Sequence, residues 1–216
     1  MADVELDSGE VVVAHCTNSG SMKSCLEEGA RVWLSPVNNP ARKTKFTWEM
    51  IRIGNGWVGI NTSIPNALVY QAMKHDAIEG LKGYTDIRRE VTFMDSRFDI
   101  CAKGNGPTCF VEVKNVTLNE GGVAMFPDAV TTRGQKHLDT LVRVKEEKMR
   151  AVLLFAVQRT DVNSFAPATH IDPVYTEKLN RAMQHGVEVI PWQVDVRPGS
   201  IIPVGVLPFG KNQVKQ

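Results

Sequence analysis

The sequence predicts a two-part α/β protein, in which a small N-terminal β-barrel precedes a mixed β-sheet flanked by helices. Two observations predict this fold class. Short strand-like runs separated by turn residues fill roughly the first sixty residues, a spacing typical of small barrels. Strand-like and helix-like segments then follow in the order β-β-β-α-β-α-β over residues 85–190, which indicates a mixed sheet with helices on it. The expected domains are 1–63 and 64–216.

The barrel strands are expected where apolar residues form short or alternating runs. The last two of these runs are joined by Gly54-Asn55-Gly56, a sequence typical of a hairpin turn. The expected strands are Val11–His15, Arg31–Leu34, Phe46–Ile53 and Trp57–Ile60.

In the second part, the apolar spacing alternates between the strand period and the helix period. Ser63 and Pro65 are typical of a helix start and predict a helix over 65–76. The continuous apolar run 150–157 is typical of a central buried strand. Further helices are expected over 134–149 and 173–185, further strands over 88–93, 97–101, 108–116 and 187–190, and an edge strand in the tail after Pro198.

Composition excludes several classes of protein. The 216-residue chain has a net charge of +1, so nucleic-acid binding would depend on a local patch rather than on overall charge. An apolar run of eighteen residues is lacking and the first residues are acidic, which predicts a cytoplasmic protein that does not cross a membrane. The cysteines (Cys16, Cys25, Cys101 and Cys109) form no C-x-x-C pair and are expected to be reduced thiols. The oligomeric state is open, a homo-oligomer included.

Three charged residues in neighbouring apolar runs form the main candidate site. Asp99 ends one run, and Glu112 and Lys114 follow in the next. Residues two apart on a strand share a face, so Glu112 and Lys114 point the same way. If the two runs are adjacent strands, two carboxylates and an ammonium meet, which suits a Mg²⁺ or Mn²⁺ site for cutting a phosphodiester. The alternative is an ordinary solvated strand face, because Glu-x-Lys is a common pattern.

Four side chains able to donate hydrogen bonds gather where the next helix begins: Arg133, Gln135, Lys136 and His137. A helix N-terminus favours anions, so this cluster predicts phosphate contact, with Gln135 supporting the metal or the attacking water. The alternative is that Thr131 or Thr132 caps the helix while the basic residues lie in solvent.

Two other basic groups are candidate DNA contacts. Arg42 and Lys43 lie in a loop before an aromatic strand, and cations beside aromatic rings are how small barrels hold nucleic-acid strands. The alternative places the nearby tryptophans in the core. Arg88 precedes Glu90, which is either a third carboxylate of the metal site or, as we favour, part of an exposed Arg–Glu pair. Asp172 is expected to cap a helix rather than to form a catalytic pair with His170.

Segments along nearly the whole chain resemble the sugar fermentation stimulation protein A family of prokaryotes. The matching segments are His15–Met22, Asn39–Lys43, Thr47–Glu49, Gly83-Tyr84, Arg88–Val91, Ser96–Asp99, Val111–Leu118, Phe126–Val130, Arg133–Leu138, Ala151–Val157 and His170–Pro173.

The resemblance implies an N-terminal OB-like barrel and a second domain akin to the PD-(D/E)XK nucleases. Positions matching Asp99, Glu112 and Lys114 hold the metal and catalytic residues in that superfamily, and Gln135 best matches an assisting polar residue. The family is described as DNA-binding, with a proposed regulatory part in sugar (maltose) metabolism. Its members usually begin about a dozen residues earlier with a basic strand, so the barrel's first strand is expected to be shortened here.

The sequence therefore predicts a DNA-binding protein with a nuclease-like site for Mg²⁺ or Mn²⁺. Asp99 and Glu112 are the predicted metal ligands, with Lys114 and Gln135 completing the catalytic set. The predicted DNA contacts are Arg42, Lys43, Arg88, Arg133 and Lys136. The alternative is a non-catalytic, sequence-nonspecific DNA-binding regulator with the same fold.

Overall fold

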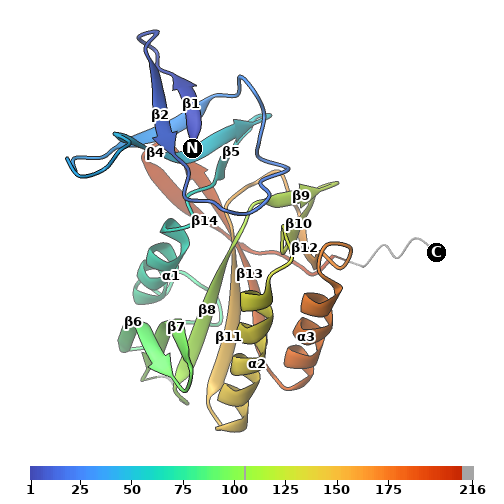
Figure 1. Ribbon diagram of the computed structural model, residues 1–216. Helices are drawn as coiled ribbons and strands as arrows, with labels where there is room; N and C mark the ends of the chain where they lie inside the picture. The colour runs from blue at the N-terminus through green and yellow to red at the C-terminus, as the bar shows by residue number, and fades with distance from the viewer. Residues whose placement is uncertain (105, 211–216) are drawn as a thin grey trace.

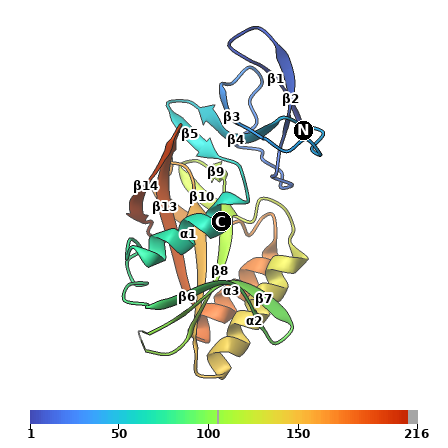
Figure 2. The ribbon, with the colours of Figure 1, turned by 90° about the vertical axis from the view of Figure 1, so that its left-hand side faces the viewer.

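The computed structural model describes residues 1–104 and 106–210 (Figure 1). A group of N-terminal strands stands at one end of the molecule, and a larger sheet with helices forms the rest, as the two views of the ribbon show (Figures 1 and 2). The fold is mixed α/β, as the sequence predicts. No helix within the described residues is long and apolar enough to cross a membrane.

The N-terminal strands form a five-stranded sheet. Its order is β1-β2-β4-β3, and β5 pairs with β4. The elements are β1 (Ala2–Glu5), β2 (Val11–His15), β3 (Val32–Pro36), β4 (Phe46–Ile53) and β5 (Gly56–Gly59). The predicted hairpin joins β4 to β5, with Gly54 at a φ of 55° that glycine adopts readily. Trp48 and Ile51 of β4 pack with Val58 and Ile60 in a small core, which confirms the core interpretation for Trp48.

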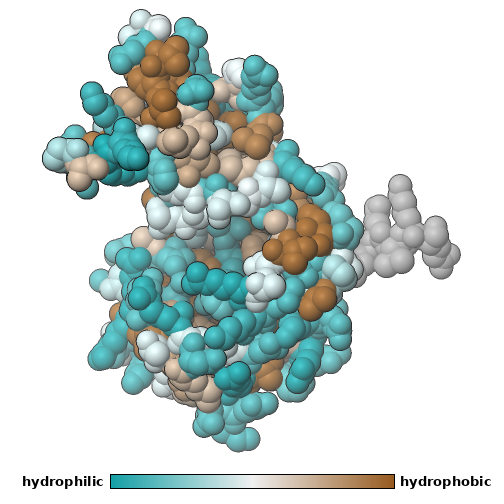
Figure 3. Space-filling view, viewed as in Figure 1, coloured by the Kyte–Doolittle hydropathy of each residue, from teal (hydrophilic) through white to brown (hydrophobic). Residues whose placement is uncertain are grey.

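One side of this sheet is open. Strands β1 and β3 end the hydrogen-bonded path, and no pairing joins them within the described part of the chain. A groove of about 770 Å³ is lined by both strands together with Phe46, Trp48 and Ile51. Val11 and Val13 of β2 are exposed, and Figure 3 shows apolar residues gathered over this end of the molecule. The predicted shortening of the first strand stays a prediction.

The second part is built on a six-stranded mixed sheet in the order β14-β13-β11-β8-β7-β6. The central strands β8, β11 and β13 run parallel, whereas β6, β7 and β14 pair antiparallel with their neighbours. The strands are β6 (Asp86–Phe93), β7 (Ser96–Lys103), β8 (Cys109–Val116), β11 (Arg150–Val157), β13 (Glu188–Arg197) and β14 (Ser200–Val206). Strand β11 is buried on both faces, as its apolar run predicts.

Helices cover both faces of this sheet. Helix α1 (Ile64–Lys74) packs on one face, and α2 (Thr132–Glu146) and α3 (Pro173–Gln184) pack on the other (Figure 2). Asp172 accepts a hydrogen bond from the backbone N–H of Tyr175 and so caps α3, which confirms the predicted cap. A three-stranded sheet of β9 (Leu118–Glu120), β10 (Val123–Phe126) and β12 (Ser164–Pro167) lies outside the sequence-based expectation.

The N-terminal sheet is fixed to the larger one where β8 and β11 end. Arg159 is 1% exposed and donates to the carbonyl of Thr117, to Oγ of Ser24 and to Asp161. The backbone N–H of Gly59 donates to the carbonyl of Gln158 over 3.0 Å. These contacts hold the N-terminal part against the ends of the central strands, where the candidate site lies.

Candidate metal centre

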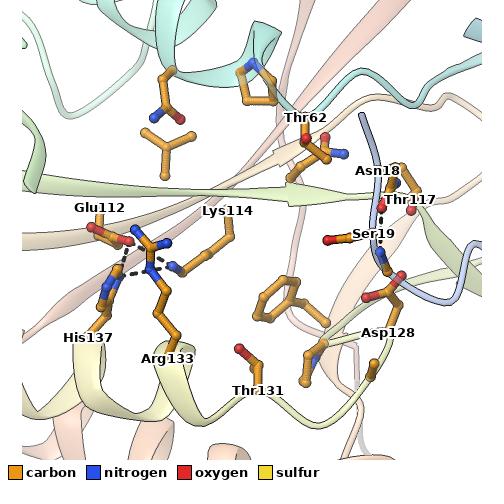
Figure 4. A pocket seen from close by; sticks show the side chains of 18 of the residues that line it. Asn18, Ser19, Thr62, Glu112, Lys114, Thr117, Asp128, Thr131, Arg133 and His137 are labelled. Atoms are coloured by element: carbon orange, nitrogen blue, oxygen red, sulfur yellow. Dashed lines mark hydrogen bonds and ion pairs between the residues drawn. The ribbon is translucent and has the colours of Figure 1, made fainter. Parts of the chain in front are cut away.

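A pocket of about 480 Å³ lies between the N-terminal part and the helix-covered sheet (Figure 4). Strand β8 crosses it, the start of α1 lies on one side, and the loop into α2 lies on the other. Its lining includes Asn18, Ser19, Gly20, Thr62, Asn66, Asp99, Glu112, Lys114, Phe126, Asp128, Val130, Thr131, Arg133 and His137. The three residues of the predicted Asp-Glu-Lys site are therefore brought to one cavity.

Asp99 stands where two strands separate. Strands β7 and β8 pair from Ile100 opposite Val111 to Ala102 opposite Cys109, and this pairing does not extend to Asp99. The Asp99 carboxylate bridges the opening, because its Oδ2 atom accepts from the backbone N–H of Val113 over 2.7 Å. Its Oδ1 atom accepts from the Asn66 amide of α1 over 2.5 Å. Asp99 is thereby held between the strand and the helix.

Glu112 and Lys114 project from β8 toward α2. The Nζ atom of Lys114 lies 2.7 Å from Oε1 of Glu112, and Nδ1 of His137 contacts the same oxygen (Figure 4). His137 Nδ1 also lies 3.2 Å from Lys114 Nζ. Glu112 is only 3% exposed, so its charge is balanced by neighbouring side chains rather than by bulk water.

The start of α2 determines which of its side chains reach the pocket. Thr131 caps the helix by accepting from the backbone N–H of Gly134 over 3.0 Å, which is the cap that the sequence left as an alternative. Arg133 and His137 are four residues apart, so they share a helix face, and both line the pocket.

Gln135 is placed differently from the sequence prediction. It lies about 200° around the helix from Arg133, so its side chain points away from the pocket. Its amide donates to both carboxylate oxygens of Asp172 over 3.1 Å, and it is not among the residues that line the cavity. The helical residue that contacts Glu112 and Lys114 is His137.

The two carboxylates differ in their electrostatic surroundings. Burial, together with the negative charge of Glu112, raises the pKa of Asp99 to about 6, although the Val113 N–H and Lys114 act in the opposite direction. Burial alone would also raise the pKa of Glu112. The contact with His137 and the charge of Lys114 outweigh burial and lower the pKa of Glu112 below its usual value. An added cation would favour the ionised form of both groups.

The donor set suits a hard cation bound by few protein ligands. No group of three His, Cys, Asp or Glu side chains that could hold a metal occurs in residues 1–104 and 106–210. Asp99, Glu112 and Asp128 are the carboxylates that line the pocket, and Mg²⁺ is commonly held by one or two carboxylates with water and phosphate oxygens completing its shell. Asp99 and Glu112 are the residues that could hold such an ion.

The other predicted DNA contacts are spread over the surface. Only Arg133 lines the pocket. Arg88 pairs with Asp86 over 2.9 Å, and Lys136 pairs with Asp95 over 3.2 Å. Arg42 and Lys43 lie in the loop between β3 and β4, where Arg42 donates to Oγ1 of Thr47 over 3.3 Å. Glu90, considered as a third carboxylate, forms an ion pair with Arg97.

Sequence reasoning missed several residues of the pocket. Asn66 has no local pattern that marks it as a partner of Asp99. The loop residues Asn18, Ser19 and Gly20 lie in the matching segment His15–Met22, but they were not assigned to this site. His137 was grouped with the basic cluster, and its spacing of four from Arg133 is the signal that could have selected it.

Comparison with known proteins shows which family models and which proteins this chain is similar to. Residues 63–200 match the model of the sugar fermentation stimulation protein RE domain, and residues 1–60 match the SfsA N-terminal OB domain. A sugar fermentation stimulation protein homolog of Geotalea uraniireducens is 47% identical over 208 residues, which cover 96% of this chain and 90% of that protein. A homolog of Geobacter sulfurreducens is 49% identical over 202 residues, covering 93% of this chain and 87% of that protein.

A solved structure is also similar. It is described as Pyrococcus furiosus SfsA in complex with Ca²⁺, and it matches with a TM-score of 0.86 and 26% identity over 94% of this chain and 88% of that one. The family models together span most of the chain, and the two homologs are similar along nearly all of it. The chain therefore belongs to the sugar fermentation stimulation protein family.

Proposed function

We propose that this protein binds DNA and hydrolyses a phosphodiester in the pocket with the help of Mg²⁺ or Mn²⁺. The observation that carries the proposal is the meeting of Asp99, Glu112 and Lys114 in one cavity from two neighbouring strands. On this reading the larger domain is a PD-(D/E)XK-like nuclease domain and the N-terminal part an OB-like DNA-binding module. The proposed setting is the cytoplasm, with a regulatory part in sugar metabolism.

The residues present fit a divalent cation. Asp99 and Glu112 offer hard oxygen ligands, and the raised pKa of Asp99 reflects the cost of holding a second negative charge in a buried place beside Glu112. A cation between them would remove that cost. The similar protein from Pyrococcus furiosus was solved with Ca²⁺, which also prefers oxygen ligands.

Each polar group has a distinct part in the proposed reaction. When bound, the cation would supply Lewis-acid stabilisation of the phosphate and a more acidic water. Lys114, held against Glu112, would donate to a phosphate oxygen as negative charge develops there. Arg133 and the N-terminus of α2 border the same cavity and would hold the neighbouring phosphate.

The second candidate function is DNA binding without cleavage. It is favoured by the contacts on Glu112, whose Oε1 atom is already engaged by both Lys114 and His137. If these internal contacts persist when DNA is bound, they neutralise the charge of the Glu112 carboxylate. A cation would then bind there with little additional stabilisation. The pocket would then serve only to hold phosphate.

The test is cleavage of end-labelled single-stranded and duplex DNA in Mg²⁺, Mn²⁺ or EDTA. We expect product only with a cation, and loss of product in Asp99→Asn and Lys114→Met. Glu120→Gln is the matched control, because Glu120 is paired with His170 outside the pocket. This variant should cleave DNA as the wild type does. Product that persists in both pocket variants would contradict the proposal. Salt-sensitive binding without product at any cation concentration would favour the alternative.

A further inference from the structure

A loop of the N-terminal part closes one side of the pocket. The backbone N–H of Met22 lies 3.4 Å from Oδ2 of Asp128, across 106 positions of sequence. Gly20 approaches the same carboxylate so closely that a Cβ atom there would lie 2.2 Å from Oδ2. Figure 4 shows the loop segment of Asn18 and Ser19 passing beside Asp128. The two domains thus meet directly at the pocket rim.

Glu112, Lys114 and His137 are recessed in the pocket, whereas Arg133 is exposed. The side chains of Lys114 and His137 are 15% and 12% exposed, and Glu112 is almost completely buried. A phosphate must therefore enter the cavity to reach them. The volume of about 480 Å³ is that of a small-molecule site rather than of a surface that accommodates a duplex.

The overall charge of the protein does little to attract a duplex backbone. Binding to duplex DNA draws its affinity from several Lys or Arg contacts with phosphates, yet the net charge here is only +1. Some of the exposed basic side chains lie beside carboxylates of the same chain. These pairs are Arg88–Asp86, Arg97–Glu90, Lys136–Asp95, Arg143–Asp95 and Arg197–Asp195.

The lining of the pocket combines charged groups with apolar surface. Lys114 is paired with Glu112, Arg133 is exposed, and the apolar side chains of Phe126 and Val130 line the same cavity. Single-strand sites combine a few phosphate contacts with an apolar or aromatic surface for the bases. A flexible strand can also follow a narrow, partly closed path that a duplex cannot enter.

We infer that the pocket takes a single strand of DNA and excludes an intact duplex, and this inference rests on the function proposed above. Lys114 and Arg133 contact successive phosphates, and an unpaired base lies against Phe126 and Val130. The contact between the Gly20 segment and Asp128 limits the width of the entrance. The substrates are therefore single strands, gaps and overhanging ends.

Circular substrates test the inference without interference from fraying ends. A single-stranded circle and a relaxed, covalently closed duplex circle of the same sequence are compared at one Mn²⁺ concentration. We expect the single-stranded circle to be nicked at least about tenfold faster. Equal rates, or faster nicking of the duplex circle, would overturn the inference while leaving the proposed hydrolysis intact.

Two valines provide a matched pair of variants. Val130 is 68% exposed at the pocket, and Val174 is 47% exposed in α3 outside it. We expect Val130→Glu to weaken binding of a labelled single strand at least about fivefold, because its carboxylate meets the entering phosphates. Val174→Glu should bind as the wild type does. An unchanged affinity in Val130→Glu would contradict the assigned path.

A change at the rim tests the role of the closed entrance. Asp128→Ala removes the side chain that meets the Gly20 segment, so the rate on duplex should rise relative to the rate on single strand. A general gain from the lost negative charge would raise both rates and leave their ratio unchanged, which would argue against a steric role.

If no DNA yields product, the proposed hydrolysis fails. Fluorescence anisotropy then decides the inference, which requires at least about tenfold tighter binding of single strand than of duplex.

Discussion

The Nζ atom of Lys114 lies 2.7 Å from Oε1 of Glu112, and the two residues are separated by one position on β8. The strand period places both on the face that α2 covers. Because Glu112 is almost fully buried, this contact fixes the charge of its carboxylate and at the same time holds the lysine in the pocket. Stability and the proposed function would therefore be coupled at this pair.

Replacing Lys114 with methionine should affect both properties. Without the ammonium, the rate of cation-dependent cleavage should fall about 10²- to 10³-fold, the usual effect of removing one donor that stabilises developing charge. Glu112 would lose a partner while staying buried, so the free energy of unfolding at pH 7 should fall by about 2 kcal/mol. Lys103→Met, at the exposed end of β7, is the control.

The stability effect of Lys114→Met has a defined dependence on pH. The pKa of Glu112 is lowered in the folded state, so its stabilising contribution is present above the pKa of the unfolded chain and is lost as pH falls. The difference between variant and wild type should thus shrink toward acidic pH. Urea unfolding across this range measures it, and a difference that stays constant would contradict the assigned role of the ion pair.

The Asp99 carboxylate should make the free energy of unfolding depend on pH with the opposite sign. Burial and the charge of Glu112 raise its folded-state pKa to about 6, so the folded protein binds more protons than the unfolded chain between about pH 4 and pH 6. Its stabilising contribution is complete below pH 4 and is lost as pH rises through about 6. Asp99→Asn cannot ionise, so in EDTA it should be more stable than the wild type by about 2 kcal/mol at pH 7, with little difference at pH 4.

Cation and control measurements sharpen this test. Millimolar Mg²⁺ should reduce the advantage of Asp99→Asn, because only the wild type gains from pairing the ionised carboxylate with the cation. Asp95→Asn is the control, since contact with Lys136 lowers the pKa of Asp95 and its contribution changes with pH in the other direction. A stability difference for Asp99→Asn that does not change from pH 4 to pH 7 would show that the carboxylate is not perturbed.

Two arginines of the predicted DNA-binding set should behave differently. Arg133 borders the pocket, whereas the Arg88 guanidinium is already 2.9 Å from Asp86. We expect Arg133→Ala to reduce the slope of log affinity against log salt by the amount that corresponds to about one lost phosphate contact. Arg88→Ala should leave the slope unchanged. Anisotropy titrations from about 50 to about 200 mM salt measure both slopes. A reduced slope for Arg88→Ala alone would place the DNA on the other end of the sheet.

Local patterns predict the parts of this fold that depend on neighbours in sequence. The hairpin at Gly54-Asn55-Gly56, the buried run of β11 and the cap at Asp172 were all predicted correctly. Each is decided by residues within a few positions, where turn geometry, burial or capping leaves a readable pattern.

The rest depends on contacts between distant segments. Met22 meets Asp128 across 106 positions, and Asn66 meets Asp99 across 33. No periodicity connects such pairs, so the pocket rim and the support of Asp99 could not be predicted. The small sheet of β9, β10 and β12 was missed for the same reason, because β10 pairs in parallel with a strand some forty residues later.

Gln135 and His137 provide the sharpest comparison between sequence prediction and structure. Gln135 donates to Asp172, the buried cap of α3, whereas His137 contacts Glu112 and lies beside Lys114. We expect Gln135→Ala to cleave within about twofold of the wild type and to lose about 1 kcal/mol of unfolding free energy, because a hydrogen bond to a charged group is removed. His137→Ala should lose at least about tenfold in cleavage rate, since Lys114 is less well positioned.

Conservative variants separate positioning from a general loss of structure. His137→Gln keeps a polar group that can reach Glu112 and should recover part of the lost rate, while unfolding curves for both His137 variants should stay cooperative. The measurements are single-turnover cleavage rates in Mn²⁺ and urea unfolding of the same preparations. Loss of cleavage in Gln135→Ala with normal cleavage in His137→Ala would restore the sequence-based assignment, and it would mean that α2 turns to face the pocket differently when DNA is bound.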